Sequence, residues 1–273
     1  MNKGLDLFSL QDKVIVVTGA TGVLGEAFVN GIASAGASVV ISGRNEEIAS
    51  QRAAEVNRNG GKAIFIIANV LDEPALMAAN ERVIAEFGRV DALVNAAGGN
   101  VAEAVVQPDK GVFDLNIQAL KQAFDLNLFG TILPTQVFGK EIARQGGSIV
   151  NISSVSASQA ITRVLGYSLA KSAIDSYTKW MAVELANRYG DKIRMNAIVP
   201  GFFITNQNRA LLTNTDGSLT ARGNAIISKT PYKRFGNPEE LIGALIYLLS
   251  DASKFVNGEN LTVDGGFCAF SGV

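Results

Sequence analysis

The stretch "VIVVTGATGVLGEAFVNGIASAG", residues 14–36, decides the fold class of this chain. An apolar, β-branched run leads into Gly19, Gly22 and Gly25, and a helical pattern follows. Glycine lets the backbone turn sharply and approach a pyrophosphate, whose charge the free N–H groups at a helix start favour. Glycines also serve ordinary tight turns. After the first strand of a doubly wound sheet, however, they predict a dinucleotide-binding loop.

The same kind of apolar run recurs along the chain, with helix-length segments between the runs. Further strands are predicted at residues 38–42, 63–68, 91–96, 148–153, 193–199 and 260–264, and amphipathic helices at 45–58, 73–87 and 170–188. Strand and helix alternating in this way predict an α/β fold with a parallel sheet and helices on both faces. Residues 1–273 are therefore predicted to form one Rossmann-type, doubly wound domain. The stretch 201–230 breaks the rhythm and is predicted to be a substrate loop or lid.

Composition excludes several classes of function. The chain has 273 residues, is 48% hydrophobic and carries a formal charge of −1, which predicts no nucleic-acid or membrane partner. Cys268 is the only cysteine, there is no histidine, and no metal-ligand spacing is present, so no metal site is expected. The first residues lack the apolar core of a secretion signal. A cytoplasmic location is predicted.

The end of the second predicted strand bears on cofactor choice. An acidic side chain there would accept a hydrogen bond from a ribose 2′-hydroxyl and repel a 2′-phosphate. This chain has Ser42 and Gly43 at that place, followed by Arg44. A guanidinium suits a phosphate, which slightly favours NADP(H). Stacking on adenine, or exposure to solvent, is the alternative for Arg44.

The segment "GYSLAKSAIDS", residues 166–176, places Tyr167 and Lys171 four residues apart, one above the other on a helix face. Many such pairs are ordinary surface pairs. Free tyrosine ionises at about pH 10, and a nearby ammonium favours the phenolate. We therefore expect Lys171 to lower the pKa of Tyr167 toward the range in which proton transfer works, so that the pair replaces a histidine.

With the glycine loop, "NAAG" at 95–98, this tyrosine–lysine pair and "PG" at 200–201, the chain resembles the short-chain dehydrogenase/reductases from Lys13 to its carboxyl end. The resemblance implies an NAD(P)-dependent oxidoreductase with four catalytic residues: Asn127, Ser154, Tyr167 and Lys171. It implies that Tyr167 exchanges the proton, Ser154 polarises the carbonyl, Lys171 also holds the nicotinamide ribose, and Asn127 supports a water relay. For Asn127, satisfying helix backbone is the alternative.

The resemblance also implies a cofactor site. Its expected residues are Gly19, Thr21, Gly22, Val23, Leu24, Arg44, Asn69, Val70, Asn95, Ala96, Gly98, Tyr167, Lys171, Pro200, Gly201, Phe203 and Thr205. Two positions depart from the family pattern. Val23 stands where short members have glycine, and Asn69 replaces the usual acid that meets the adenine.

The substrate is expected to contact the insertion, where "FFITNQNRALL" offers Asn206, Gln207, Asn208 and Arg209. Amides suit hydroxyl groups and a guanidinium suits a carboxylate, which indicates a sugar acid. Arg209 is the expected carboxylate partner and Arg163 its competitor. Asn100 is expected to border the substrate, because "NAAGGN" leaves room beside the nicotinamide. A solvated loop is the alternative for each of these side chains.

Three further stretches, "PGFFITNQNRALL", "TPYKRFGNPEEL" and "VDGGFCAFSGV", look like those of bacterial D-mannonate oxidoreductases, also called fructuronate reductases. That resemblance implies hydride transfer between D-mannonate and D-fructuronate, usually with NAD(H), and a homotetramer. A gluconate 5-dehydrogenase is the alternative enzyme. A cofactor-binding regulator without catalysis is the alternative of another class, although it would be expected to lose Tyr167 or Lys171.

Overall fold

The computed structural model describes residues 3–107, 109, 111–206 and 208–272. It contains one seven-stranded sheet in the order β3-β2-β1-β4-β5-β6-β7, and every neighbouring pair of strands is parallel. The strands are β1 (Val14–Thr18), β2 (Ser38–Gly43), β3 (Lys62–Ile67), β4 (Ala92–Asn95), β5 (Gly147–Ile152), β6 (Ile193–Pro200) and β7 (Asn260–Val263). The predicted doubly wound α/β fold is confirmed, and all seven predicted strands are present.

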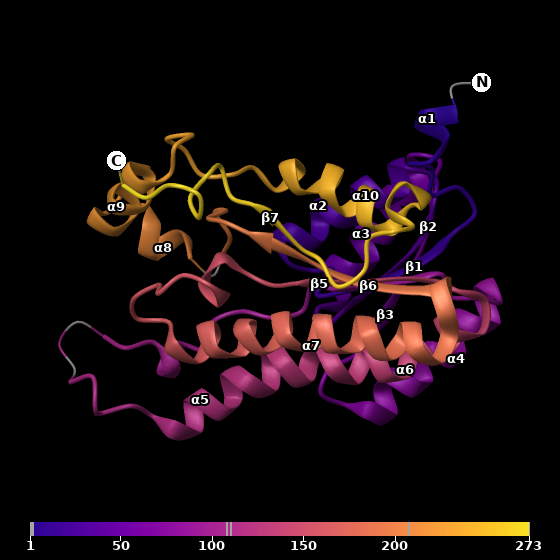
Figure 1. The fold of residues 1–273 in the computed structure, drawn as a ribbon, viewed down its shortest axis with the longest axis horizontal. Coiled ribbons are helices and arrows are strands. Elements are labelled where there is room, and N and C mark those ends of the chain that lie inside the picture. The colour runs from indigo at the N-terminus through magenta and orange to yellow at the C-terminus, as the bar shows by residue number, and fades with distance from the viewer. Residues whose placement is uncertain (1–2, 108, 110, 207, 273) are drawn as a thin grey trace.

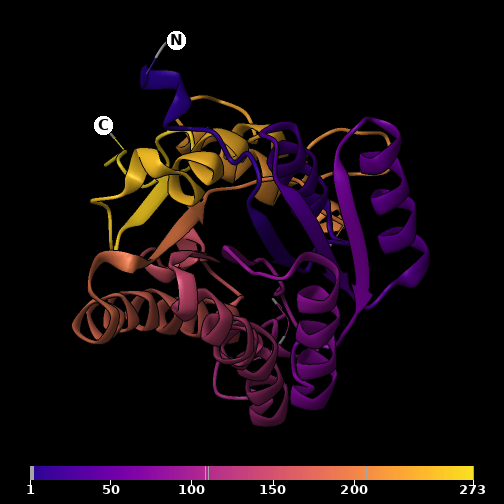
Figure 2. The ribbon, with the colours of Figure 1, turned by 90° about the vertical axis from the view of Figure 1, so that its right-hand side faces the viewer.

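Helices cover both faces of this sheet (Figures 1 and 2). In the described residues the α-helices are α1 (Lys3–Asp6), α2 (Val23–Ser34), α3 (Glu46–Arg58), α4 (Glu73–Phe87), α5 (Ile117–Phe124), α6 (Gly130–Gln145), α7 (Leu165–Tyr189), α8 (Arg209–Leu212), α9 (Ala221–Lys229) and α10 (Ile242–Leu249). Helices α2, α3 and α10 lie on one face, and α4, α6 and α7 lie on the other. No helix in this part of the chain is both long enough and apolar enough to cross a membrane.

Two apolar clusters hold these layers together, one on each side of the sheet. One cluster joins Phe28 and Ile32 of α2 to Leu245 of α10, and the other joins Leu76 of α4 to Phe138 of α6. Strands β1, β2, β4, β5 and β6 between them are buried on both faces, which explains their continuous apolar sequences, whereas the edge strands β3 and β7 are partly exposed. The sheet is therefore a rigid platform.

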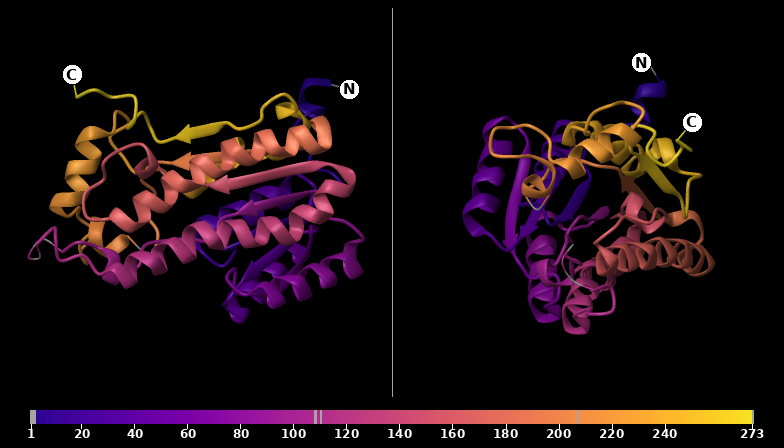
Figure 3. Two further views of the ribbon diagram at one scale, coloured as in Figure 1. Left: turned by 60° about the horizontal axis from the view of Figure 1, so that its bottom comes forward. Right: turned by 90° about the vertical axis from the view of Figure 1, so that its left-hand side faces the viewer.

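The carboxyl ends of the central strands align at one edge of this platform. Thr18 of β1 pairs with Asn95 of β4, which pairs with Asn151 of β5. On the other side of β5, Ile152 pairs with Ile198 of β6. The strand arrows point toward α8 and α9 of the predicted insertion, which cover this end of the molecule (Figures 1 and 3).

Two glycines of the first loop are required by close backbone contacts. Gly19 has a φ of +65°, and a Cβ there would lie 2.5 Å from the carbonyl oxygen of Ala96. A Cβ on Gly25 would lie 2.5 Å from the carbonyl oxygen of Gly19. A Cβ on Gly22 would lie 3.3 Å from that same oxygen, so position 22 has more room. Gly19 therefore lets the turn after β1 approach the loop after β4, and Gly25 lets α2 pack directly on that turn.

We expect Gly25→Ala to lower the free energy of unfolding by about 1–3 kcal/mol, because the new methyl group overlaps backbone atoms. The matched control is Gly243→Ala in α10, where a Cβ would meet nothing within 4 Å. That change should stabilise the protein by about 0.5–1 kcal/mol, since alanine favours a helix interior over glycine. Urea unfolding followed by circular dichroism measures both effects. Equal effects of the two substitutions would contradict the packing argument.

Candidate active site

A cavity of about 420 Å³ lies at the carboxyl edge of the sheet and collects segments distant in sequence. Its wall contains nearly all of the expected cofactor residues. These are Gly19, Thr21, Gly22, Val23, Leu24, Arg44, Asn69, Val70, Ala96, Gly98, Tyr167, Lys171, Pro200, Gly201, Phe203 and Thr205. The position is the one at which ligands bind in doubly wound sheets.

The glycine turn at one end of the cavity has the features of an anion cradle. Helix α2 begins after Gly22, which supplies no side-chain cap to the first N–H groups of the helix. The hydroxyl of Thr18 accepts hydrogen bonds from the backbone N–H groups of Ala96 and Ala97 at 3.2 and 3.3 Å, which ties this turn to the end of β4. Uncapped N–H groups at a helix start favour a phosphate. The residues present therefore fit the pyrophosphate of a dinucleotide.

Arg52 of α3 braces this turn from behind, and the sequence analysis missed it. Its guanidinium donates to the carbonyl oxygens of Ala20 and, at 2.9 Å, Gly22, and pairs with Glu26 at 2.8 Å. Burial lowers the pKa of Arg52, while Glu26 works in the opposite direction. No sequence motif marks this arginine, because its contacts depend on how α3 packs beside α2.

The end of β2 carries no acidic side chain of the kind that would select NAD. A Cβ on Gly43 would lie 2.6 Å from Cγ2 of Thr21, so a carboxylate at 43 would displace that side chain. Ser42 is buried, and its hydroxyl has no hydrogen-bond partner among the described residues. Arg44 is exposed and lines the cavity. These contacts are compatible with a 2′-phosphate beside Arg44.

Asn69 and Asn95 are held by the protein in different ways. Asn69 lies in the cavity wall, where its side-chain oxygen accepts a hydrogen bond from the N–H of Leu71 at 3.1 Å. Asn95 lies behind the wall, and its amide donates to Thr135 and Asn151, both at 2.9 Å. Its side chain thus links β4 to β5 and α6 within the protein. The structure does not bring the side chain of Asn95 to the cavity.

Tyr167, Lys171 and Ser154 come together at the middle of the cavity. The ammonium of Lys171 lies 5.4 Å from the centre of the Tyr167 ring, as expected for residues four apart on α7. It donates to the carbonyl oxygen of Ile152, the last residue of β5, at 2.7 Å. Ser154 follows two residues later, begins the 3₁₀ turn η3 (Val155–Ala157) and hydrogen-bonds with the phenol of Tyr167. The pair is therefore not a surface pair.

The expected direction of the Tyr167 pKa is wrong. Burial raises the pKa of Tyr167 above its ordinary value, and the hydrogen bond with Ser154 only partly opposes this. Burial also lowers the pKa of Lys171 to about 8, against the influence of Asp175. Loss of solvent around the phenol disfavours the charged phenolate, and this effect outweighs the one expected from the nearby ammonium. A phenol that stays protonated at neutral pH suits an acid in carbonyl reduction.

Asn127 lies in a π-helical turn, η2 (Asp125–Phe129), between α5 and α6. Its side-chain oxygen accepts from the N–H of Gly99 at 2.9 Å, and its amide donates to the carbonyl oxygens of Gly99 and Ala123 at 2.9 and 2.8 Å. Single π-turns inside α-helices are frequent at functional sites. Asn127 thus joins this helix to the loop after β4, behind the cavity wall. Its role in a water relay stays a prediction.

The expected substrate residues are only partly brought together. Asn100 and Asn208 line the cavity. The side chain of Asn208 also braces its own loop, because it accepts a hydrogen bond from the N–H of Thr205 and donates one to the carbonyl oxygen of Phe203, both at 2.8 Å. Arg209 is exposed and begins α8 outside the wall. Arg163 donates to Val106 and Gln107, also outside the wall. Gln207 lies outside the described residues.

Arg222 of α9 is the arginine of the insertion that does line the cavity. Its guanidinium donates to the hydroxyl and the carbonyl oxygen of Thr162 at 3.1 and 3.0 Å. Arg222 was not predicted from the sequence, because the amide-rich run that suggested a substrate contact lies around Arg209, at the start of the insertion. One sequence feature that indicates a helix here is Thr220, a residue type that favours helix starts. Its hydroxyl accepts a hydrogen bond from the backbone N–H of Gly223 at 3.1 Å and caps α9.

Known proteins resemble this chain over nearly all of its length. Residues 19–268 match the family model described as enoyl-(acyl carrier protein) reductase. A Haemophilus influenzae protein crystallised with NAD, and provisionally described as a D-mannonate oxidoreductase, is 42% identical over 100% of both chains, with a TM-score of 0.89. A gluconate 5-dehydrogenase from Burkholderia cenocepacia, bound to NADP and tartrate, is 34% identical and covers 97% of this chain and 98% of that one, with a TM-score of 0.85. A 2-dehydro-3-deoxy-D-gluconate 5-dehydrogenase from Formosa agariphila is 33% identical over 98% of this chain and 97% of its own length.

The position of Arg44 generates a prediction about cofactor choice. We expect Arg44→Ala to raise the KM for NADPH roughly tenfold and the KM for NADH less than twofold. The reason is that both cofactors carry the pyrophosphate, but only NADPH carries the 2′-phosphate that the guanidinium would bind. Steady-state kinetics with each cofactor measures the difference. Equal increases for both cofactors, or a wild-type protein that strongly prefers NADH, would contradict this interpretation.

Proposed function

This chain belongs to the short-chain dehydrogenase/reductase family of NAD(P)-dependent oxidoreductases, and we propose that it interconverts a secondary alcohol and a ketone of a sugar acid, with D-mannonate and D-fructuronate as the pair. The observation that carries this proposal is the position of Tyr167, Ser154 and Lys171 in one cavity with the glycine turn. A bound nicotinamide would supply or accept the hydride. The chain itself supplies the proton and fixes the carbonyl.

In this proposal Tyr167 is the acid for ketone reduction and its phenolate is the base for alcohol oxidation. Ser154 lies beside the phenol and donates a hydrogen bond to the carbonyl oxygen of the substrate. Lys171, held by Ile152 at 2.7 Å, holds the nicotinamide ribose and keeps positive charge close to the phenol. Asn127 supports the relay of protons to Lys171 from behind the cavity wall.

A sugar-acid substrate is supported by the polar groups of the wall and by the relatives. Asn100, Asn206 and Asn208 border the cavity, and amides suit a polyhydroxylated chain. All three relatives described above carry names of enzymes that act on sugar acids. We also propose that residues 201–230, which include α8 and α9, act as a lid over this substrate.

A gluconate 5-dehydrogenase activity is the second candidate. The specific observation in its favour is Arg44 in the cavity wall together with the lack of an acidic side chain at Ser42 and Gly43, which suits NADP. The Burkholderia relative of that name was crystallised with NADP. A cofactor-binding regulator is less well supported, because both Tyr167 and Lys171 are retained.

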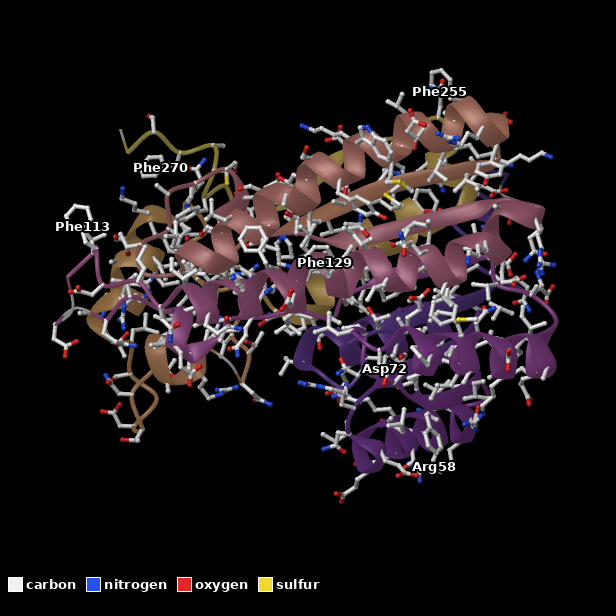
Figure 4. The ribbon with its side chains drawn as sticks, turned by 90° about the horizontal axis from the view of Figure 1, so that it is seen from below. Arg58, Asp72, Phe113, Phe129, Phe255 and Phe270 are labelled. Atoms are coloured by element: carbon white, nitrogen blue, oxygen red, sulfur yellow. The ribbon has the colours of Figure 1, made fainter. Side chains whose placement is uncertain are left out.

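Homotetramer formation and a cytoplasmic location stay predictions. Exposed apolar side chains on α7, namely Leu169, Trp180 and Val183, are compatible with an interface. Phe129, the last residue of η2, is an exposed apolar side chain as well (Figure 4).

The test of the function is turnover on a panel of keto acids and hydroxy acids with each cofactor. D-Fructuronate reduction faster than reduction of 5-keto-D-gluconate supports the first candidate, and the reverse order supports the second. Cofactor binding without turnover on any member would support a regulator.

We expect Tyr167→Phe to lower kcat by at least about 10²-fold in both directions, because the proton donor is removed while the aromatic ring remains. The dissociation constant of the cofactor should change less than threefold, as measured by quenching of protein fluorescence. Tyr177→Phe is a matched control on the same helix, since Tyr177 packs in the core away from the cavity. Near-normal turnover of Tyr167→Phe would refute the assigned role.

A further inference from the structure

Arg222 connects the insertion to the catalytic segment of the chain. It lies in the first turn of α9, and its two hydrogen bonds reach Thr162, in the segment between Ser154 and Tyr167. Ser156, Ile161 and Val164 of that segment line the cavity together with Arg222. The guanidinium thus lies against the segment that connects Ser154 to Tyr167, in the wall of the same cavity.

The charge of Arg222 has no acidic partner among the ion pairs of the described residues. Burial lowers the pKa of Arg222, and the nearby positive charge of Arg163 lowers it further. Side chains of Ile161, Leu211 and Leu212 make the surrounding wall partly apolar. A partly desolvated cation that is repelled by a second cation gains from a bound anion.

The hydrogen-bonding capacity of Arg222 is only partly used. Thr162 accepts two of its hydrogen bonds, and a guanidinium has further N–H donors in the same plane. A carboxylate matches that planar arrangement. The bonds to Thr162 hold the guanidinium in one orientation, so that less side-chain freedom is lost when an anion binds.

The two arginines expected from the sequence lack these features. Arg209 is exposed and lies outside the cavity wall. Arg163 directs its guanidinium to Val106 and Gln107, and thereby braces the loop after β4. Arg163 is close enough for its positive charge to lower the pKa of Arg222, but Arg163 itself does not line the cavity.

We propose that Arg222 binds the carboxylate of the substrate and thereby selects sugar acids over neutral ketones. This assignment rests on the proposed function, because it names the residue that recognises the acid group at the same site. It also gives α9 a function, since the substrate carboxylate would fasten the insertion over the cavity through Arg222.

The test compares D-fructuronate with its methyl ester, which keeps the ketone and hydroxyl groups but lacks the charge. For Arg222→Ala we expect kcat/KM to fall roughly ten- to hundredfold on the acid and less than threefold on the ester, as for loss of one charge-assisted contact. Arg222→Lys keeps the positive charge but lacks the planar guanidinium. Its kcat/KM on the acid should therefore fall by less than that of Arg222→Ala but remain below that of the wild type. Arg209→Ala, in the same insertion but outside the wall, should change both substrates less than threefold.

A bracing role would give a different result. If Arg222 only held Thr162, then Arg222→Ala and Thr162→Ala would reduce turnover of acid and ester alike, and the proposal would be overturned. Cofactor affinity and the thermal midpoint of each variant show whether the fold is kept. Should Arg222→Ala not fold, an unchanged acid-to-ester ratio in Arg222→Lys overturns the proposal by itself.

The same experiment separates this inference from the proposed function. A wild-type protein that reduces neither D-fructuronate nor any other keto acid would refute both. A wild-type protein that prefers the keto acid, with Arg222→Ala showing equal losses on acid and ester, would refute only the role of Arg222.

Discussion

The buried ammonium of Lys171 is the constraint on which the arrangement of this site depends. A buried charge is costly unless it is hydrogen-bonded, and the carbonyl oxygen of Ile152 accepts from Lys171 at 2.7 Å. Because Ile152 ends β5 and Lys171 lies on α7, this bond fixes the helix relative to the sheet edge. It consequently fixes the distance between Ser154, two residues beyond Ile152, and Tyr167, one turn before Lys171.

A second set of contacts closes the same site from the β4 side. Asn127 holds Gly99 through both of its backbone groups, and a Cβ on Gly98 would lie 2.7 Å from the side-chain oxygen of Asn127 and 3.3 Å from the ammonium of Lys171. The π-turn that carries Asn127 is packed against α7. The groups proposed for catalysis are thus placed by strand ends and helices that pack in the two apolar clusters. Most of the substrate contacts proposed above come instead from the insertion at residues 201–230.

The sequence predicted most of the fold and the placement of Tyr167 beside Lys171 because their signals are local. Apolar runs indicated the seven strands, and the spacing of Tyr167 and Lys171 indicated a shared helix face. The place of Arg222 in the cavity wall could not be predicted, because the direction of its side chain depends on the packing of α9. The pKa of Tyr167 was mispredicted for a related reason: burial of the phenol is a property of the folded chain.

The most direct test of hydride transfer at this site is the fate of deuterium placed at both C4 positions of the reduced nicotinamide, so that either face of the ring would deliver the label. With D-fructuronate as substrate, the account predicts a product with one deuterium on the new carbinol carbon and a hydroxyl proton taken from solvent. Mass spectrometry and nuclear magnetic resonance of the isolated product measure this. Conversion of the substrate with no deuterium on that carbon would contradict the account.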